Sequence, residues 1–173
     1  MFRRQGEQMR TLRGIALGLF GATCVPALVF SAIGLALSGA SGFAPDALAS
    51  GAFRFAIPAA IVAGAHALLL GLPAFLVLWK LGKANWLTSA SGGFVIGAAP
   101  LLLYSFPRDR PGWSSSGRMW GEVRDFYVNG TPTVWEWLNY AQSAVYLGLF
   151  GLCGGLAFWL LWKRFGPQPS SSD

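Results

Sequence analysis

Residues Ala56–Trp79 read AIPAAIVAGAHALLLGLPAFLVLW, an apolar run of 24 residues in which His66 is the only ionisable side chain. An α-helix of this length rises about 36 Å, which is enough to cross a hydrocarbon core of roughly 30 Å. Lipid offers no hydrogen-bond partner to backbone amides, so a segment that crosses it must be helical. The run therefore predicts a transmembrane helix.

Three more apolar segments of this kind surround the first one. Hydrophobic residues make up 54% of the chain and charged residues only 12%, about half the usual globular share of ~25%. We therefore expect an all-α integral membrane protein with four transmembrane helices in a bundle. The predicted spans are residues 15–37, 56–79, 86–106 and 133–162.

The segments between the spans are short or polar. Residues 1–14 are a basic cytoplasmic N-terminus, 38–55 a first outer loop with a possible helical turn after Pro45-Asp46, and 163–173 a cytoplasmic tail. The turn 80–85 contains Gly82, which suits a left-handed helix end, and Asn85, a good helix cap. Residues 107–132 form an ordered, aromatic-rich outer loop.

Two features concern the ends of the spans. Thr133-x-x-Glu136 has the form of a capping box, which predicts an interfacial helix that continues into the fourth span. The basic start of the chain and the apolar run after it also allow a cleaved signal peptide. Signal peptides have apolar cores of about 7–15 residues, so we expect the longer run here to be retained. Pro26 should bend it.

The charges of the chain predict its orientation. In a four-span arrangement one side carries eight cations and two acids, and the other side carries five of each. The positive-inside rule then places both termini and the 80–85 turn in the cytoplasm. The chain resembles small bacterial inner-membrane proteins in general character, without a motif specific to one family. We expect a bacterial inner-membrane location, with the lipid bilayer as partner and no role for nucleic acid.

His66 is the candidate polar site inside the membrane. A histidine at mid-membrane should face other helices, because exposure of a polar group to lipid is costly. Either it is a ligand, switch or transport-path residue, or it is a neutral residue bonded to a nearby hydroxyl or carbonyl. No carboxylate lies within any span to pair with it, which favours the structural role.

Small residues predict where helices approach one another closely. Three G-x-x-x-G pairs occur, one of them at Gly14 and Gly18, and such pairs allow close crossing within a chain or between chains. The third span is the least apolar and the richest in small residues, so we expect it inside the bundle. The candidate helix-packing residues are Gly93, Gly97, Gly148, Gly151 and Gly155.

The outer loop and the first turn of the last helix combine arginines with aromatic residues. This mixture is typical of membrane-interface anchors and also of protein contact surfaces. The candidate partner contacts are Trp113, Trp120, Arg124 and Trp135. The loop carboxylates sit beside arginines without a histidine, a cysteine or a G-x-S-x-G motif, so we expect no catalytic residues and no enzyme.

Neither a metal nor a cofactor is expected. Cys24, Cys153 and His66 could in principle offer three metal ligands, but their spacing matches no metal motif.

Two hypotheses for function remain. The first is a non-enzymatic interaction or accessory module that assembles with itself or with a partner membrane protein. The alternative is a small transporter or channel subunit, which would have to be a homo-oligomer because four helices hardly enclose a pore. The absence of a continuous polar stripe along the third span favours the first hypothesis.

Overall fold

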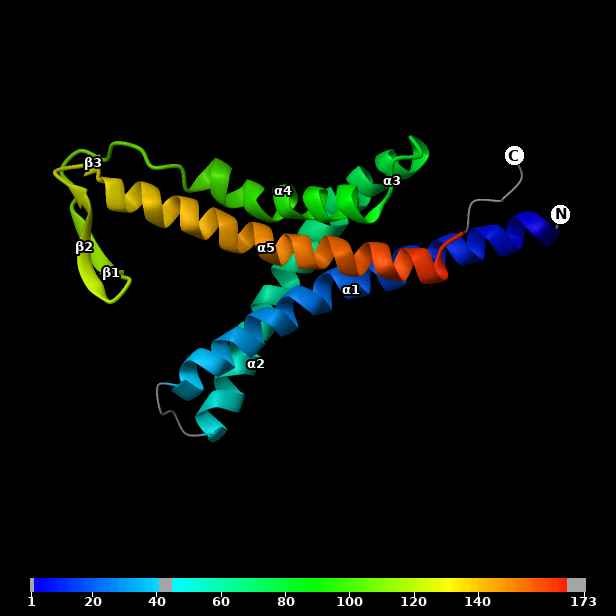
Figure 1. Cartoon of the computed structure of the whole chain (residues 1–173), viewed down its shortest axis with the longest axis horizontal. Helices are drawn as coiled ribbons and strands as arrows, with labels where there is room; N and C mark the ends of the chain where they lie inside the picture. The colour runs from blue at the N-terminus through cyan, green and yellow to red at the C-terminus, as the bar shows by residue number, and fades with distance from the viewer. Residues whose placement is uncertain (1, 41–44, 168–173) are drawn as a thin grey trace.

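The computed structural model describes residues 2–40 and 45–167, and this part of the chain is mostly helical (Figure 1). The helical elements are α1 (Phe2–Ala40), α2 (Pro45–His66), the π-helix η1 (Ala67–Gly71), α3 (Leu72–Lys80), α4 (Trp86–Tyr104) and α5 (Val134–Phe165). Between α4 and α5 lie three strands, β1 (Ser115–Met119), β2 (Glu122–Val128) and β3 (Thr131–Pro132).

Four helical segments are long and apolar enough to cross a membrane, as the sequence predicts. They are Gln8–Ala36, Ala56–Lys80, Trp86–Tyr104 and Val134–Phe165. The second of these combines the end of α2 with η1 and α3, and we call it the second span. It buries the smallest share of its residues, 6% against 17–28% in the other three. The second span is therefore the one with the thinnest protein contacts.

The turn between α3 and α4 has the predicted chemistry. Gly82 adopts a left-handed conformation with φ +66°, which only glycine reaches without strain. Asn85 caps α4, because its Oδ1 accepts a hydrogen bond from the Thr88 amide at 2.9 Å. In return, the Asn85 amide donates to Thr88 Oγ1 at 3.0 Å. This reciprocal pair fixes the start of α4 and confirms both predicted roles.

The start of α5 follows the expected cap only in part. Thr133 is the N-cap, and its hydroxyl accepts a hydrogen bond from the Trp135 amide at 3.2 Å. The Glu136 carboxylate hydrogen-bonds with Asn139 instead of turning back to the cap. One threonine is thus sufficient to begin this helix.

The helix boundaries differ from the expected ones in the first third of the chain. α1 begins at Phe2 and ends at Ala40, so the basic residues predicted as a separate N-terminal segment belong to the same helix. The first outer loop, predicted at 38–55, is helical from Pro45 onward, and its residues 41–44 lie outside the described part. Figure 1 shows α1 curving along its length, as expected for a helix with Pro26 in its interior.

The second outer loop contains an antiparallel sheet, which corrects the all-α prediction. Its strand order is β1-β2-β3, and the β1–β2 pairing runs from Ser115↔Tyr127 to Met119↔Glu122. Both connecting turns have two residues with positive φ, Trp120-Gly121 (52° and 88°) and Asn129-Gly130 (50° and 88°). These are the values of the tight turns that join twisted antiparallel strands.

Helix α5 is the element on which the others pack. α4 and the middle of α1, from Arg13 to Phe30, lie along it, and α2 packs on α1. An aromatic cluster closes the contact between α3 and α5, where the Phe75 ring lies 4.6 Å from Phe158 and 5.1 Å from Trp162. All three side chains are buried. This cluster is the largest apolar core of the described residues.

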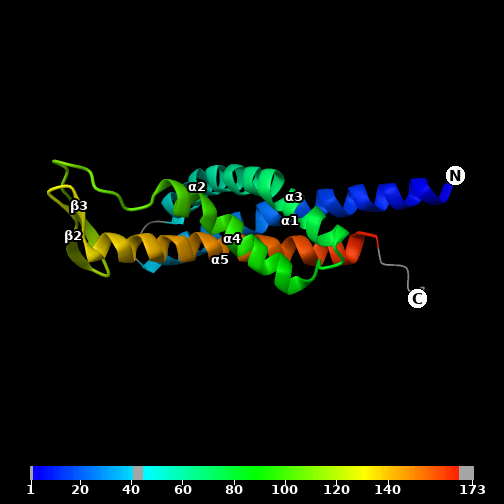
Figure 2. The same ribbon diagram turned by 90° about the horizontal axis from the view of Figure 1, so that it is seen from above.

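The helix ends and the sheet lie at opposite ends of the molecule. The start of α1, the end of α5 and the turn after α3 lie at one end, and the sheet lies at the other (Figure 1). The view from above shows the same division, with α2 and α3 to one side of α5 (Figure 2). At the first end, the Arg13 guanidinium lies over the Phe165 ring at 5.3 Å, which joins the two helices there.

Candidate functional site

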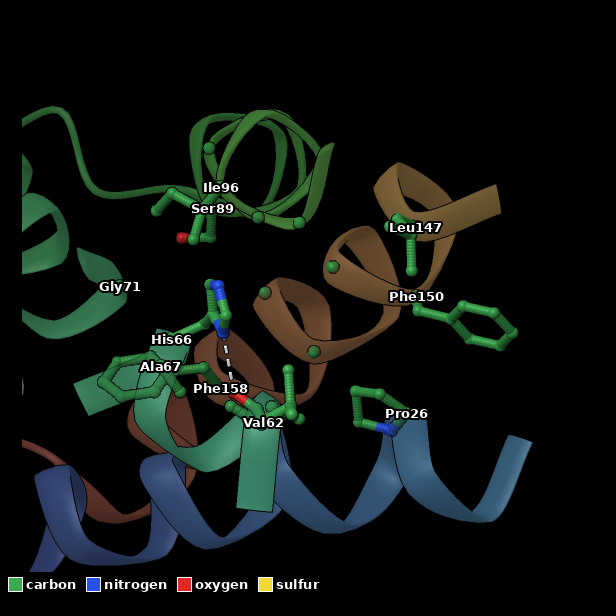
Figure 3. Close-up of a pocket in the computed structure, with 18 of the residues that line it drawn as sticks. Pro26, Val62, His66, Ala67, Gly71, Ser89, Ile96, Leu147, Phe150 and Phe158 are labelled. Atoms are coloured by element: carbon green, nitrogen blue, oxygen red, sulfur yellow. Dashed lines mark hydrogen bonds between the residues drawn. The ribbon is translucent and has the colours of Figure 1, made fainter. Parts of the chain in front are cut away.

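A mostly apolar cavity of about 490 Å³ lies between α1, α2, α4 and α5, and η1 and α3 also line it. Figure 3 shows it with α4 above, α1 below and α5 to one side. Its volume falls in the range of small-molecule pockets, about 300–1,000 Å³. Only His66, Thr88 and Ser89 contribute polar side-chain atoms among the described lining residues.

His66, the residue singled out from the sequence, lies at this cavity. Its Nδ1 donates a hydrogen bond to the Val62 carbonyl oxygen, 2.7 Å away in the preceding turn of α2. The other ring nitrogen, Nε2, points toward α4 (Figure 3). Bonding of one nitrogen to a carbonyl agrees with the structural interpretation of this residue. It leaves the second nitrogen at the cavity.

The π-helix η1 begins directly after His66. A π-helical turn holds one more residue than an α-helical turn, and such turns are frequent at functional sites. Pro73, just beyond it at the start of α3, has no amide hydrogen to donate to the preceding turn. The missing amide hydrogen of Pro73 therefore explains why the helical turn between His66 and the aromatic cluster is irregular.

Ser89 is the cavity residue that the sequence did not single out. It is 7% exposed, and its Oγ is buried without a hydrogen-bond partner. A helical serine usually bonds the carbonyl four residues earlier, here that of Asn85. That oxygen accepts the ordinary helical bond from the Ser89 amide at 3.0 Å, and Ser89 Oγ makes no bond to it. Figure 3 shows the Ser89 side chain between α4 and the His66 ring.

Thr88 differs from its two polar neighbours because its hydroxyl is satisfied. It donates to the Lys83 carbonyl oxygen at 2.8 Å and also takes part in the cap of α4. Of the other two polar side chains, Ser89 has its Oγ buried without a partner, and His66 bonds through Nδ1.

The predicted helix-packing glycines all lie at the crossing of α4 and α5. A Cβ added at Gly93 would collide with the Gly151 carbonyl oxygen, and one added at Gly97 would lie 3.0 Å from Gly151 Cα. The Gly148 position is filled by the ring of Phe94, and that of Gly155 by the Ser89 carbonyl. The two backbones thus touch along the wall of the cavity, which holds Ser89 in place.

The other glycine pair noted in the sequence lies between α1 and α5. A Cβ at Gly14 would lie 2.8 Å from Gly166 Cα, and one at Gly18 would lie 2.8 Å from the Phe158 ring. The glycines described here are therefore occupied by contacts within the chain. They do not form a surface open to a second chain.

The candidate outer-loop residues fall into two groups. Trp120, Arg124 and Trp135 form one group, in which the Arg124 guanidinium lies 4.1 Å from the Trp135 ring centre and also pairs with Glu122. Trp120 reaches back along α5 and donates from Nε1 to Gln142 Oε1 at 3.0 Å. These contacts attach the sheet to the first turns of α5.

Trp113 forms the second group, together with Tyr127 and Arg110. Its ring centre is 4.7 Å from that of Tyr127, which is 3% exposed. The Arg110 guanidinium covers both rings at 5.0 and 5.6 Å. Trp113 therefore contributes to the interior of the sheet region, although part of it remains exposed.

The described residues contain no cluster that could hold a metal ion, since no three His, Cys, Asp or Glu side chains among them come close enough together. Cys24 and Cys153 are free, partly buried thiols. Comparisons of the chain with protein-family models, with curated protein sequences and with solved structures found no match.

Proposed function

We propose that the chain is a multi-pass integral protein of a bacterial inner membrane, with four helices packed as a bundle and both termini in the cytoplasm. Four apolar helices of sufficient length support the insertion. The start of α1, the end of α5 and the turn after α3 lie together, and cations mark all three, among them Arg13, Lys83 and Arg164. This clustering supports the cytoplasmic assignment.

Reporter fusions test this topology. A reporter placed after Gly82 is expected to give a cytoplasmic signal, and one placed after Gly112 an external signal, because an odd number of helix crossings separates them. Both positions are exposed turns with positive φ, so the fusions leave the helices intact. The measurement is paired fluorescent-protein and alkaline-phosphatase activity in cells. Reversed signals, or identical signals at the two sites, contradict the topology.

The function that the geometry supports best is that of a non-enzymatic interaction module, which assembles with itself or with a second membrane protein through the outer sheet. The carrying observation is Trp120. It is 69% exposed although it occupies a turn position with φ 52°, where a bulky side chain is strained. Strain of this kind persists where the surrounding structure and the function require it.

Two other features favour assembly through the outer sheet. The glycines that would favour a crossing between two chains are used inside this one. The sheet is attached to α5 through Trp120 and Arg124, so it offers its exposed residues on a fixed support. A preordered aromatic surface loses little conformational entropy on binding.

The test is the native mass of the protein in nanodiscs, with co-purifying chains identified. We expect a defined assembly, and we expect Trp120→Asn to shift it to the monomer. Asparagine followed by glycine favours the tight turn present here, so this variant keeps the turn and removes the ring together with its hydrogen bond to Gln142. The Arg124–Trp135 contact still joins the sheet to α5. Trp86→Asn is the control, because Trp86 is a similarly exposed tryptophan, 56%, at the opposite end of α4.

Two results would contradict the assembly. The wild-type protein could be a bare monomer, or Trp120→Asn could leave an assembly unchanged. The second result would reassign the ring to the lipid interface, where tryptophan is also favoured.

A transporter or channel subunit is the second candidate, and the cavity is the observation that favours it. His66 lines this cavity, with Nδ1 bonded to the Val62 carbonyl oxygen and Nε2 directed toward α4 (Figure 3). A homo-oligomer that Trp120→Asn does not disturb, together with uptake by reconstituted vesicles, would support this candidate over the first.

A further inference from the structure

We propose that Arg13 of α1 and Arg164 of α5, held against the ring of Phe165, bind the phosphate of an anionic phospholipid in the cytoplasmic leaflet. The inference rests on the membrane insertion and orientation proposed above, because these place this end of the molecule among lipid head groups. It does not depend on assembly through the outer sheet, which lies at the opposite end (Figure 1).

The two arginines share one aromatic ring. The Arg13 guanidinium carbon lies 5.3 Å from the centre of the Phe165 ring, and that of Arg164 lies 5.8 Å from the same centre. The separation between the two guanidinium groups therefore cannot exceed the sum of these distances. Both side chains are exposed. Two positive charges from different helices are thus gathered on one uncharged ring, and an anion beside them would be attracted by both.

The protein supplies no nearby counter-charge to this pair. No Asp or Glu lies within four residues of either arginine in the sequence, so neither has an acidic neighbour on its own helix. Among the described residues, neither guanidinium forms an ion pair or donates a hydrogen bond. Each guanidinium carries five N–H donors, and an aromatic ring uses none of the geometry that suits a phosphate.

Backbone contact between the two helices holds the pair in place. A Cβ added at Gly14, the residue after Arg13, would lie 2.8 Å from Gly166 Cα. The Gly166 amide donates to the Trp162 carbonyl oxygen at 2.7 Å, which closes the last turn of α5 at Arg164. The helix end itself carries a partial negative charge of about half an elementary charge, which balances only a fraction of two arginines.

Aromatic residues place the pair at the depth of the lipid head groups. Trp162, one turn before Phe165, packs against Trp79 with ring centres 5.3 Å apart, and Trp79 is partly exposed. Tryptophan rings are favoured at the membrane–water interface. In the proposed membrane location, the cations one turn beyond this level therefore lie where the lipid phosphates are.

The helix faces that continue from the pair into the membrane suit acyl chains. Arg13 and Phe20 are seven residues apart on α1, and Leu160 and Arg164 are four apart on α5, so each arginine shares a helix face with a deeper apolar residue. Phe20 is 67% exposed and Leu160 is 58% exposed. A free phosphate would contact only the arginines, whereas a phospholipid also covers these apolar side chains. A head group with net negative charge, such as phosphatidylglycerol, brings no ammonium group toward the arginines.

The experiment compares three probes of the full-length wild-type protein. The protein in neutral dodecyl maltoside micelles is titrated calorimetrically with dihexanoyl phosphatidylglycerol, with dihexanoyl phosphatidylcholine and with inorganic phosphate, and protein-free micelles give the blank. We expect the phosphatidylglycerol to bind several-fold more tightly than either of the other two probes, because only this probe combines a net negative charge with acyl chains.

Arg13→Gln and Arg164→Gln test the two contacts. Each variant is expected to weaken the binding of the phosphatidylglycerol about fivefold, the usual effect of one cation near anionic lipid. Lys83→Gln is the matched control, because Lys83 is an exposed cation at the same end of the molecule, in the turn before α4. This variant removes the same charge outside the pair, and we expect it to bind as the wild type does.

Three results would overturn the proposal. The first is an equal response, or none, to the two lipids, which would mean that head-group charge is not recognised. The second is inorganic phosphate binding as tightly as the phosphatidylglycerol, which would assign the arginines to a free anion. The third is an equal loss in Lys83→Gln and in the arginine variants, which would replace the site by diffuse attraction.

The comparison of the three probes uses the wild-type protein, so it stays decisive if a variant does not fold. Failure of the topology fusions would instead remove the membrane premise itself.

Discussion

Replacing Gly151 with alanine is expected to destabilise the protein by about 1–3 kcal/mol, the usual cost of overpacking a close contact. The added Cβ would collide with the Gly93 carbonyl oxygen and would lie 2.9 Å from Gly97 Cα. Backbone atoms cannot rotate away as a side chain can, so α4 and α5 must separate. The measurement is the midpoint of unfolding by added SDS in mixed micelles, followed by tryptophan fluorescence.

The control for this prediction is Gly92→Ala. A Cβ at Gly92 meets nothing within 4 Å, and alanine favours a helix over glycine by about 0.5–1 kcal/mol. Gly92→Ala should therefore match or slightly exceed the stability of the wild type. Equal losses at the two positions would mean that the glycines act through backbone flexibility and that the α4–α5 contact is not close.

Phe158→Ala is the second substitution with a large expected effect. The ring lies 6% exposed between α1, α3 and α5, against Phe75 and above Gly18. In soluble proteins such a truncation costs about 3–5 kcal/mol. In the membrane location proposed above, lipid replaces water as the reference, so only the loss of packing remains, and we expect about 2 kcal/mol.

Leu160→Ala is the matched control on the same helix. Leu160 is 58% exposed, so in a bilayer its side chain contacts mainly lipid and makes few contacts with other helices. We expect its removal to change the stability by less than about 0.5 kcal/mol. The same SDS unfolding assay compares the two variants. A loss at Leu160 as large as that at Phe158 would refute the aromatic cluster as the core.

The helical part of the fold was predictable because lipid and backbone chemistry leave few choices. A run such as Ala56–Trp79 must be helical if it meets hydrocarbon, and Gly82 and Asn85 mark helix ends by their own conformations. The bounds of α1 were not predictable, since its first residues are polar and its helix continues through them. Local propensity does not show where a helix that leaves the membrane will end.

The sheet was missed although the chain contains a signal for it. Asn129-Gly130 between Phe126-Tyr127-Val128 and Thr131 is the residue pair that tight hairpin turns prefer. The first turn hides the pattern, because Trp120 occupies a position where asparagine or glycine is expected. Strand pairing also depends on contacts with Arg110 and α5, which no local window contains.

The candidate site was half visible in the sequence. His66 stands out as the lone ionisable residue of an apolar run. Ser89 does not, because a serine near the start of a helix is ordinary and normally bonds its own backbone. Its hydroxyl is buried without a partner, and this follows from the packing of α4 against the other helices, which no local stretch of sequence contains.

The π-helical turn η1 preserves the angular phase between the two halves of the second span. Each residue advances an α-helix by about 100°, and a π-helical turn advances less per residue because it holds one residue more. The extra residue is thus taken up inside η1, and α3 keeps the phase that a regular helix one residue shorter would have. His66 and Phe75 both line the cavity, and Phe75 also packs on Phe158 of α5. Deleting one residue from 67–71 is therefore expected to leave a regular helix with both side chains still facing these partners.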